Sequence, residues 1–126
     1  MSIHRLFVRI NVMAVPFSKA IETNGFVFFS GQIHIDENVK LVGETIEEKT
    51  RICMDNVGKR LEEVGLDFSD VVSSTVYLSD FNDYQAVSEV YGTYFSEPYP
   101  VRTMIGVSDL PFGASVEVTI IAVRKE

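Results

Sequence analysis

Only two segments of the chain repeat their apolar residues at the spacing of a helix, and this limits the architectures that the sequence can form. The first is predicted over residues 46–64, where Thr45-Ile46-Glu47-Glu48 is typical of a capping box. The second follows Asp80 and is expected to be stopped by Pro98 and Pro100. The apolar positions of the two helices are Ile46, Cys53, Val57, Leu61 and Val64, then Phe81, Tyr84, Val87, Tyr91 and Phe95.

The other apolar residues alternate or form short runs, which predicts strands. These are expected over residues 3–12, 20–22, 26–30, 71–78, 102–107 and 115–123, with 32–35 continuing the third. In the strand over 71–78, Val72, Val76 and Leu78 are expected to share one face. Asn24-Gly25 predicts a tight hairpin because both residues tolerate a positive φ. Pro16 is expected to end the first strand.

This order, β-β-β-α-β-α-β-β, predicts a two-layer α+β sandwich with a mixed sheet and both helices on one face. The other face is then left without cover by the chain itself. It is expected to carry Tyr77, Met104, Thr119 and Ile121. Since a large exposed apolar patch usually marks an interface, the layer pattern predicts an oligomer.

The chain of 126 residues shows no repeat, linker or low-complexity tract, so one domain over 1–126 is expected. Hydrophobic residues make up 46% and charged residues 23%, which is typical of a folded globule. The formal net charge is −7 and the pI is about 4.8. This balance argues against nucleic acid as a partner, because phosphate binding requires a basic surface.

Several classes of site lack the residues they need. Cys53 is the only cysteine, which excludes an intramolecular disulfide and a cysteine-based zinc site. His4 and His34 lie 30 positions apart, so no metal site is expected, and no glycine-rich phosphate loop is found. There is no apolar run long enough to cross a membrane and no secretory signal, and a cytoplasmic protein is predicted.

Two charged residues interrupt sequence that is otherwise typical of a sheet. Arg102 begins a strand and Glu117 lies within the most apolar strand of the chain. In one interpretation both are ordinary strand residues that face water. In the other they point into one cleft, where arginine binds a carboxylate through two hydrogen bonds and a partly desolvated glutamate deprotonates water. The pattern alone leaves both interpretations open.

Ser30-Gly31-Gln32 follows a predicted strand and has two interpretations as well. A glycine in this position lets a ligand approach the backbone closely, or it marks an ordinary bulge. Cys53 lies on the apolar side of the first helix without a nearby histidine, and it is therefore interpreted as a core residue rather than a nucleophile.

Several segments, in this order and spacing, resemble one family. They are Pro16-Phe17-Ser18-Lys19-Ala20, Asn24 through Gln32, Asn56, Val72 through Leu78, Asp80-Phe81, Tyr91, Phe95, Pro100-Val101-Arg102-Thr103, Leu110-Pro111, Val116-Glu117-Val118 and Ala122. Over essentially its whole length the chain is similar to the RidA family, also called YjgF or endoribonuclease L-PSP.

The resemblance implies a chorismate-mutase-like fold and a homotrimer with ligand sites in the clefts between subunits. It also implies hydrolysis of reactive 2-enamine and 2-imino acids, made by pyridoxal-phosphate enzymes, to 2-keto acids and ammonia. No cofactor is implied, and the expected ligands are small carboxylates of the 2-imino and 2-keto acid classes.

The resemblance further implies the site residues. Arg102 matches the carboxylate-binding arginine, Glu117 matches the water-positioning glutamate, and Ser30-Gly31 matches the turn that contacts the ligand. The implied substrate-binding set is Phe17, Ser30, Gly31, Ser88, Thr103 and Met104. Three of these depart from the usual family residue: Phe17 replaces a tyrosine, Ser88 an asparagine and Met104 a cysteine.

The leading hypothesis is therefore an enzyme, a 2-iminobutanoate/2-iminopropanoate deaminase in which Arg102 binds the substrate carboxylate and Glu117 activates water. One alternative is a sensor or scaffold that binds small carboxylates without turnover, which the loss of a hydroxyl at Phe17 favours. The other is an endoribonuclease, against which the acidic charge counts.

Overall fold

The computed structural model describes residues 4–10 and 13–125. Its strands are β1 (His4–Ile10), β2 (Met13–Thr23), β3 (Phe26–Phe29), β4 (Gln32–Ile33), β5 (Val71–Leu78), β6 (Val101–Gly106) and β7 (Val116–Val123). Its helices are α1 (Ile46–Glu63) and α2 (Tyr84–Gly92), and short 3₁₀ turns are formed by Phe68–Asp70, Phe81–Asp83 and Pro111–Gly113.

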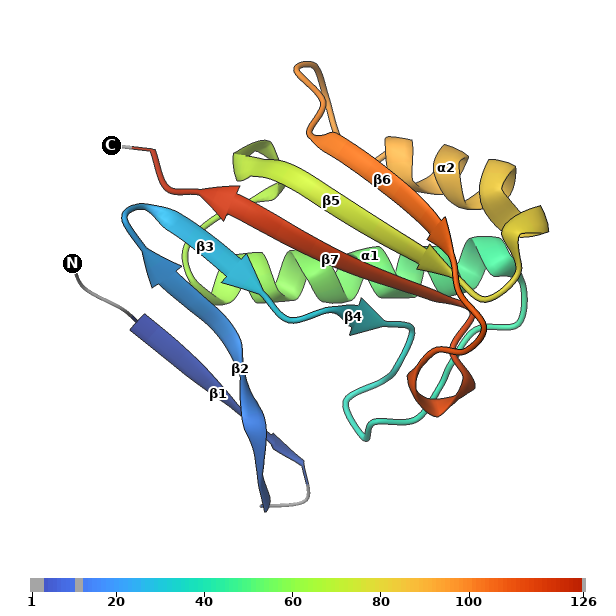
Figure 1. The fold of residues 1–126 in the computed structure, drawn as a ribbon, viewed down its shortest axis with the longest axis horizontal. Helices are drawn as coiled ribbons and strands as arrows, with labels where there is room; N and C mark the ends of the chain where they lie inside the picture. The colour runs from blue at the N-terminus through green and yellow to red at the C-terminus, as the bar shows by residue number, and fades with distance from the viewer. Residues whose placement is uncertain (1–3, 11–12, 126) are drawn as a thin grey trace.

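The strands form one mixed sheet in the order β1-β2-β3-β7-β5-β6, with β4 pairing to β7. Only β5 and β6 run parallel, because α2 carries the chain between them. Both helices lie on one side of the sheet, and β1 and β6 are its two edges (Figure 1). The predicted two-layer α+β architecture is confirmed. We call the other side of the sheet, which the helices leave uncovered, the open face.

The first helix begins and ends close to the predicted residues. Thr45 Oγ1 accepts a hydrogen bond from the Glu48 backbone N–H at 3.1 Å, as expected for a capping residue. The second half of the predicted capping box differs, because Glu48 Oε2 accepts from the backbone N–H of Glu44. After the helix, Gly65 adopts a φ of 75°, which suits glycine at the end of a helix.

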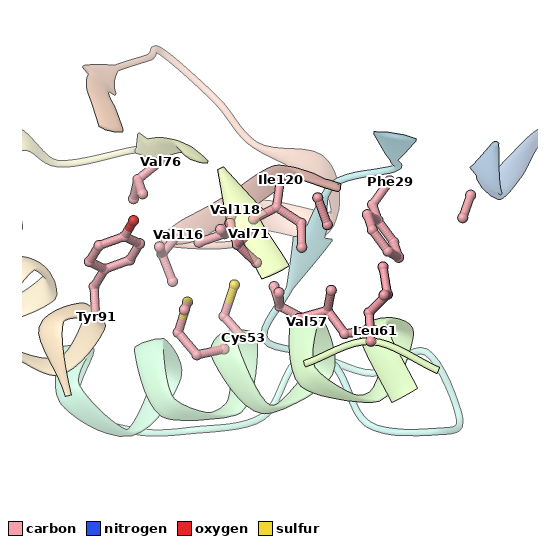
Figure 2. Close-up of a cluster of buried hydrophobic side chains, with 14 of the residues drawn as sticks. Phe29, Cys53, Val57, Leu61, Val71, Val76, Tyr91, Val116, Val118 and Ile120 are labelled. Carbon is pink, nitrogen blue, oxygen red and sulfur yellow. The ribbon is translucent and has the colours of Figure 1, made fainter. Parts of the chain in front are cut away.

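The core lies between α1 and the strands β3, β5 and β7 (Figure 2). The helix contributes Cys53, Val57 and Leu61, and the facing strands contribute alternate residues that are all buried: Val27, Phe29, Val76, Leu78, Val116, Val118, Ile120 and Ala122. The Cys53 thiol donates to the Gln32 carbonyl at 3.1 Å, and burial raises its pKa. The interpretation of Cys53 as a core residue is confirmed.

Two register shifts change what the alternation predicts. Pro16 does not end a strand but lies within β2. The register is irregular there, because the stretch Ala14–Ser18 of β2 is paired across the shorter stretch Phe7–Arg9 of β1. Such an irregularity accommodates proline, which cannot donate a hydrogen bond to the ladder. In β5 the register shifts between Val71 and Ser73, so Val71 is buried, and Val72, which was expected to share a face with Val76 and Leu78, is exposed.

The second helix and the edge strand differ from the prediction at three residues. Phe81 precedes α2 in a 3₁₀ turn capped by Asp80, and its ring is exposed rather than part of the apolar stripe. The helix ends at Gly92, before Phe95 and well before the prolines. Met104 was expected on the open face, but it packs against the core because β6 pairs it with buried Val76.

A buried histidine connects two loops. The backbone N–H of Ser115 donates to His34 Nε2 at 2.9 Å, so the proton of the neutral ring lies on Nδ1, which is 2.9 Å from the Val42 carbonyl. Burial lowers the pKa of His34. Lys49 Nζ also donates to Ser115 Oγ at 3.1 Å. The segment before β7 is thus fixed to the loop after β4 and to α1.

The open face carries large apolar side chains. Phe26 and Phe28 of β3 are about half exposed, and on the edge strand β6 Val101 is 70% and Ile105 40% exposed. Tyr77, Thr119 and Ile121 lie between them and are half-buried. Within the described residues, neither helix is long and apolar enough to span a membrane. The oligomer stays a prediction, and the face expected to support it is apolar, as predicted.

Candidate active site

Glu117 is the second residue of β7 and lies on the open face, opposite Tyr77 of β5. Its carboxylate extends over Gly31, at the end of β3. A Cβ atom on residue 31 would overlap Glu117 Oε2 and lie 3.0 Å from both Glu117 Cδ and Thr119 Oγ1. A side chain at position 31 would therefore displace the Glu117 carboxylate, and glycine leaves room for its close approach. Partial burial raises the pKa of Glu117.

Glu117 and Gly31 line a pocket of about 620 Å³. Phe17 of β2, Ser30 and Phe112 form its walls beside them. Ser30 Oγ donates to the Ser18 carbonyl at 2.6 Å, so the two segments of backbone are held together. Phe112 has a φ of 60° and is largely exposed, and its turn is fixed by the His34–Ser115 hydrogen bond described above.

Other charged side chains also line the pocket. They are Lys19 and Arg60, together with Asp36 and Glu37. Both basic groups are paired with Glu63 of α1: Arg60 Nε is 3.0 Å and Lys19 Nζ is 3.7 Å from its carboxylate oxygens. Because these basic groups are already paired, the chemistry is better sought near Glu117.

Arg102 of β6 lies in a second cluster, formed with α2. Its Nη1 donates to Ser88 Oγ at 2.8 Å and its Nη2 donates to the Tyr84 hydroxyl at 3.0 Å. The guanidinium carbon lies 5.7 Å from the centre of the Tyr84 ring and 5.4 Å from that of Tyr91. Both distances are within the range of cation–π attraction.

The charge of Arg102 is not balanced by an acidic side chain. Among the described residues, the ion pairs involve Lys19, Arg60, Arg124 and Lys125, and no carboxylate lies within 4.0 Å of the Arg102 guanidinium. Tyr91 is also kept neutral: burial raises its pKa, and its hydroxyl donates to buried Ser74 at 2.9 Å. A half-buried cation with neutral partners is well suited to bind an anion.

Within one chain, Arg102 and Glu117 lie on opposite faces of the sheet. Arg102 pairs with buried Ser74 of β5 and contacts α2, so it lies on the helix side of the sheet. Glu117 pairs with Tyr77 of β5, which lies on the open face. Arg102 does not line the Glu117 pocket. The single cleft expected from the sequence thus needs a second copy of the chain, and it stays a prediction.

The substrate-binding residues predicted from the sequence divide between these two clusters. Phe17, Ser30 and Gly31 accompany Glu117, and Ser88 accompanies Arg102. Met104 is on the same side as Arg102 but packs against the core, and Thr103 is exposed on the opposite side from Arg102. The sequence pattern does not identify Phe112 as a site residue, and it places Tyr84 only in an apolar stripe, without its contact to Arg102.

The described residues contain no group of three His, Cys, Asp or Glu side chains that could hold a metal ion. Both ring nitrogens of His34 are within hydrogen-bond distance of backbone groups. The two clusters instead offer a cation with neutral neighbours and a carboxylate of raised pKa.

A family model described as Endoribonuclease L-PSP matches residues 9–124. The chain belongs to this family. The RutC family protein of Pyrococcus abyssi is 41% identical to this L-PSP protein over 111 residues, which cover 87% of each chain. A mouse protein named 2-iminobutanoate/2-iminopropanoate deaminase is 37% identical over 110 residues, covering 86% of this chain and 82% of its own.

Solved structures of the L-PSP family share the fold. Yeast Mmf1 superposes with a TM-score of 0.89 at 29% identity, covering 98% of this chain and all of its own. TdcF of E. coli, solved with bound serine, gives a TM-score of 0.84 at 27% identity and covers 97% of this chain. The family resemblance and its α+β fold are confirmed, and the predicted enzyme class agrees with the deaminase names of relatives.

Proposed function

We propose that this L-PSP family member is a deaminase that hydrolyses 2-iminobutanoate, 2-iminopropanoate and similar products of pyridoxal-phosphate enzymes to 2-keto acids and ammonia. The observation that carries the proposal is the Arg102 guanidinium, which is half-buried, bound only by neutral hydroxyls and rings, and not paired with a carboxylate of the described chain. A carboxylate is the ligand that this arrangement favours.

Glu117 supplies the second group that the reaction needs. The pKa of Glu117 is raised toward neutral pH, and a carboxylate with a higher pKa is a stronger base toward water. With the imine nitrogen protonated, the water oxygen forms a bond to the imine carbon, the π pair of the C=N bond moves to nitrogen, and one proton of the water passes to Glu117. Glu117 then returns this proton to the nitrogen of the adduct.

The C–N bond breaks next, and its electron pair leaves with ammonia. The hydroxyl of the adduct gives its proton to the Glu117 carboxylate, the O–H electron pair forms the C=O bond of the keto product, and Glu117 then releases the proton to solvent. The role of Arg102 is to hold the carboxylate in place while this occurs, and the walls of the pocket near Phe17 and Phe112 enclose the rest of the substrate.

The site is proposed to be shared between subunits of a homotrimer. Arg102 of one subunit and Glu117 of its neighbour face the same cleft, because one chain presents them on opposite sides of its sheet. The exposed aromatic residues of the open face, Phe26 and Phe28, support association through that face.

The test is to measure the loss of 2-iminopropanoate and the affinity for 2-ketobutyrate in the wild type and in Arg102→Lys. Lysine keeps the charge but loses the planar fork, so we expect binding to weaken by roughly ten- to hundredfold, the worth of one charge-assisted hydrogen bond. Arg51→Lys is the matched control, since Arg51 is exposed on α1 and should change neither quantity.

A wild type that binds 2-ketobutyrate but does not hydrolyse imines would contradict the deaminase and favour the carboxylate sensor. A wild type that binds no 2-keto acid would contradict both functions.

A further inference from the structure

Three side chains of α2 form one face toward β6. Tyr84, Ser88 and Tyr91 are spaced four and three residues apart, which places them along one side of a helix. Tyr91 is buried and hydrogen-bonded to Ser74 of β5, so it forms a fixed wall of the arginine site. Tyr84 and Ser88 make the two hydrogen bonds to Arg102.

The two acceptors hold different nitrogens of the guanidinium. Ser88 binds Nη1 and Tyr84 binds Nη2, at 2.8 and 3.0 Å. One acceptor would leave the planar group free to turn about that contact, whereas two acceptors on separate nitrogens fix its plane. Serine is a short side chain, and its single oxygen serves only one of the two nitrogens here. The second anchor is the Tyr84 hydroxyl.

Tyr84 is itself held in place. It is the first residue of α2, directly after the 3₁₀ turn that Asp80 caps through the backbone N–H of Asn82. Its ring lies 5.4 Å from the ring of Phe81 and packs against the core. The hydroxyl therefore meets Arg102 from a rigid support, as a positioning group requires.

We propose that Tyr84 is the positioning residue for Arg102: its hydroxyl, together with Ser88, sets the plane in which the guanidinium receives the substrate carboxylate. This role rests on the proposed function, in which Arg102 binds that carboxylate. Tyr84 does not touch the reacting atoms. Its effect is on the affinity for carboxylates and on the KM, because the carboxylate is held equally in the bound substrate and in the transition state.

The variant that isolates the hydroxyl is Tyr84→Phe. It keeps the ring over Arg102 and the packing on Phe81 and removes one acceptor. We expect the Kd for 2-ketobutyrate and the KM for the imine to rise roughly three- to tenfold, because the guanidinium keeps its charge and its Ser88 contact but is no longer held in one plane, while kcat changes less. The matched control is Tyr94→Phe, because the Tyr94 hydroxyl binds Asp55 on the outside of α1 and should affect neither constant.

A rescue separates positioning from a general loss of structure. The amide oxygen of asparagine lies one bond further from the backbone than the serine hydroxyl and has two lone pairs, so in the Tyr84→Phe background Ser88→Asn should accept from both Nη1 and Nη2 and fix the guanidinium plane again. We expect the double variant to recover most of the lost affinity. Thermal unfolding of each variant checks that the fold is retained, and a loss of affinity that only follows a loss of stability would overturn the proposal.

The comparison with Arg102→Lys distinguishes the two levels of failure. If Arg102→Lys weakens 2-ketobutyrate binding but Tyr84→Phe does not, Tyr84 has no positioning role and the proposed function stands. If neither variant changes binding, Arg102 does not hold the carboxylate and the proposed function fails with it.

Discussion

Glu117 occupies a position where its ionised form lowers the stability of the folded chain. Burial raises the pKa of this carboxyl, so folding favours its neutral form. The stabilising contribution of Glu117 is therefore greatest at low pH and is lost as the pH rises through the carboxyl pKa values. Partial burial of a glutamate costs stability and gives a purely structural strand residue no advantage. A general base gains from it, because its pKa is raised.

Replacing Glu117 by glutamine should separate activity from stability. We expect Glu117→Gln to lower kcat by roughly a hundred- to ten-thousandfold, the usual contribution of a general base, while 2-ketobutyrate still binds. The melting temperature at pH 7 should be unchanged or higher, because a buried charge is removed. In the wild type, kcat/KM should fall as the pH decreases. The midpoint of this fall should lie above the ordinary glutamate pKa of about 4.3.

The control for this series is Glu62→Gln, an exposed glutamate of α1. It should change neither kcat nor the pH profile. A Glu117→Gln enzyme that retains full turnover would remove Glu117 from the mechanism.

At this scale the sequence indicated the chemistry but not the surroundings of each group. Arg102 and Glu117 stood out as charges in strands, and the family resemblance supplied their roles. The Tyr84 hydroxyl was not foreseen, because Tyr84 fits an apolar helical stripe and its spacing says nothing of what its oxygen contacts. The fit of the Glu117 carboxylate over Gly31 depends on two segments 86 positions apart in the chain.

Among the elements, those with a local cause were predicted well. The helix over Ile46–Glu63 follows from its apolar spacing and the Thr45 cap, and the β2–β3 hairpin follows from Asn24-Gly25. The errors at Pro16 and Val72 have a different origin. Both arise from register shifts between paired strands, and a register is set by the partner strand and not by the alternation of one segment.

The His34 contact between two loops gives a pH dependence to the fold. Burial lowers the pKa of His34, and protonation would replace its acceptor nitrogen with a second donor facing the Ser115 N–H. The neutral histidine therefore stabilises the fold above its ordinary pKa of about 6.5. The free energy of unfolding should fall as the pH drops from 6.5 toward the folded-state pKa, by at most about 1.4 kcal/mol per pH unit.

His34→Gln tests this contact, since glutamine has one donor and one acceptor and does not titrate. We expect denaturant unfolding of the wild type to lose stability between pH 7 and pH 5.5, and the variant to show a smaller slope. Equal slopes would mean that His34 is not the group responsible. Because Ser115 follows the turn that carries Phe112, the wild-type KM should also rise at the acid end of this range.

At the scale of the whole molecule, the sheet separates Arg102 from Glu117, the two groups of the proposed site. The layer pattern predicted that helices cover one face and that the other is apolar, and the structure agrees in both respects. The sequence pattern placed Met104 wrongly, since the side of a short edge strand depends on its register with β5. A single chain does not bring Arg102 and Glu117 into one cleft, because Arg102 does not line the Glu117 pocket.

A site shared between subunits predicts complementation between two inactive variants. Arg102→Ala subunits retain Glu117, and Glu117→Gln subunits retain Arg102, so a mixed oligomer contains some interfaces with both groups intact. With random mixing of equal amounts in a cyclic trimer, about a quarter of all sites should be complete, and in the mixed trimers alone about one site in three. Coexpression of the two variants with different affinity tags, followed by purification through both tags, gives the mixed oligomers, and imine hydrolysis is then measured.

We expect activity in the mixed oligomers well above that of either variant alone, with a KM equal to that of the wild type because the restored sites are chemically unaltered. The control is coexpression of two tagged copies of Arg102→Ala, which cannot complement each other. If each site were formed within one chain, every site in the mixture would lack one group and no activity would return. Light scattering of the purified mixture reports whether the oligomer is a trimer, and a monomer would contradict the shared site directly.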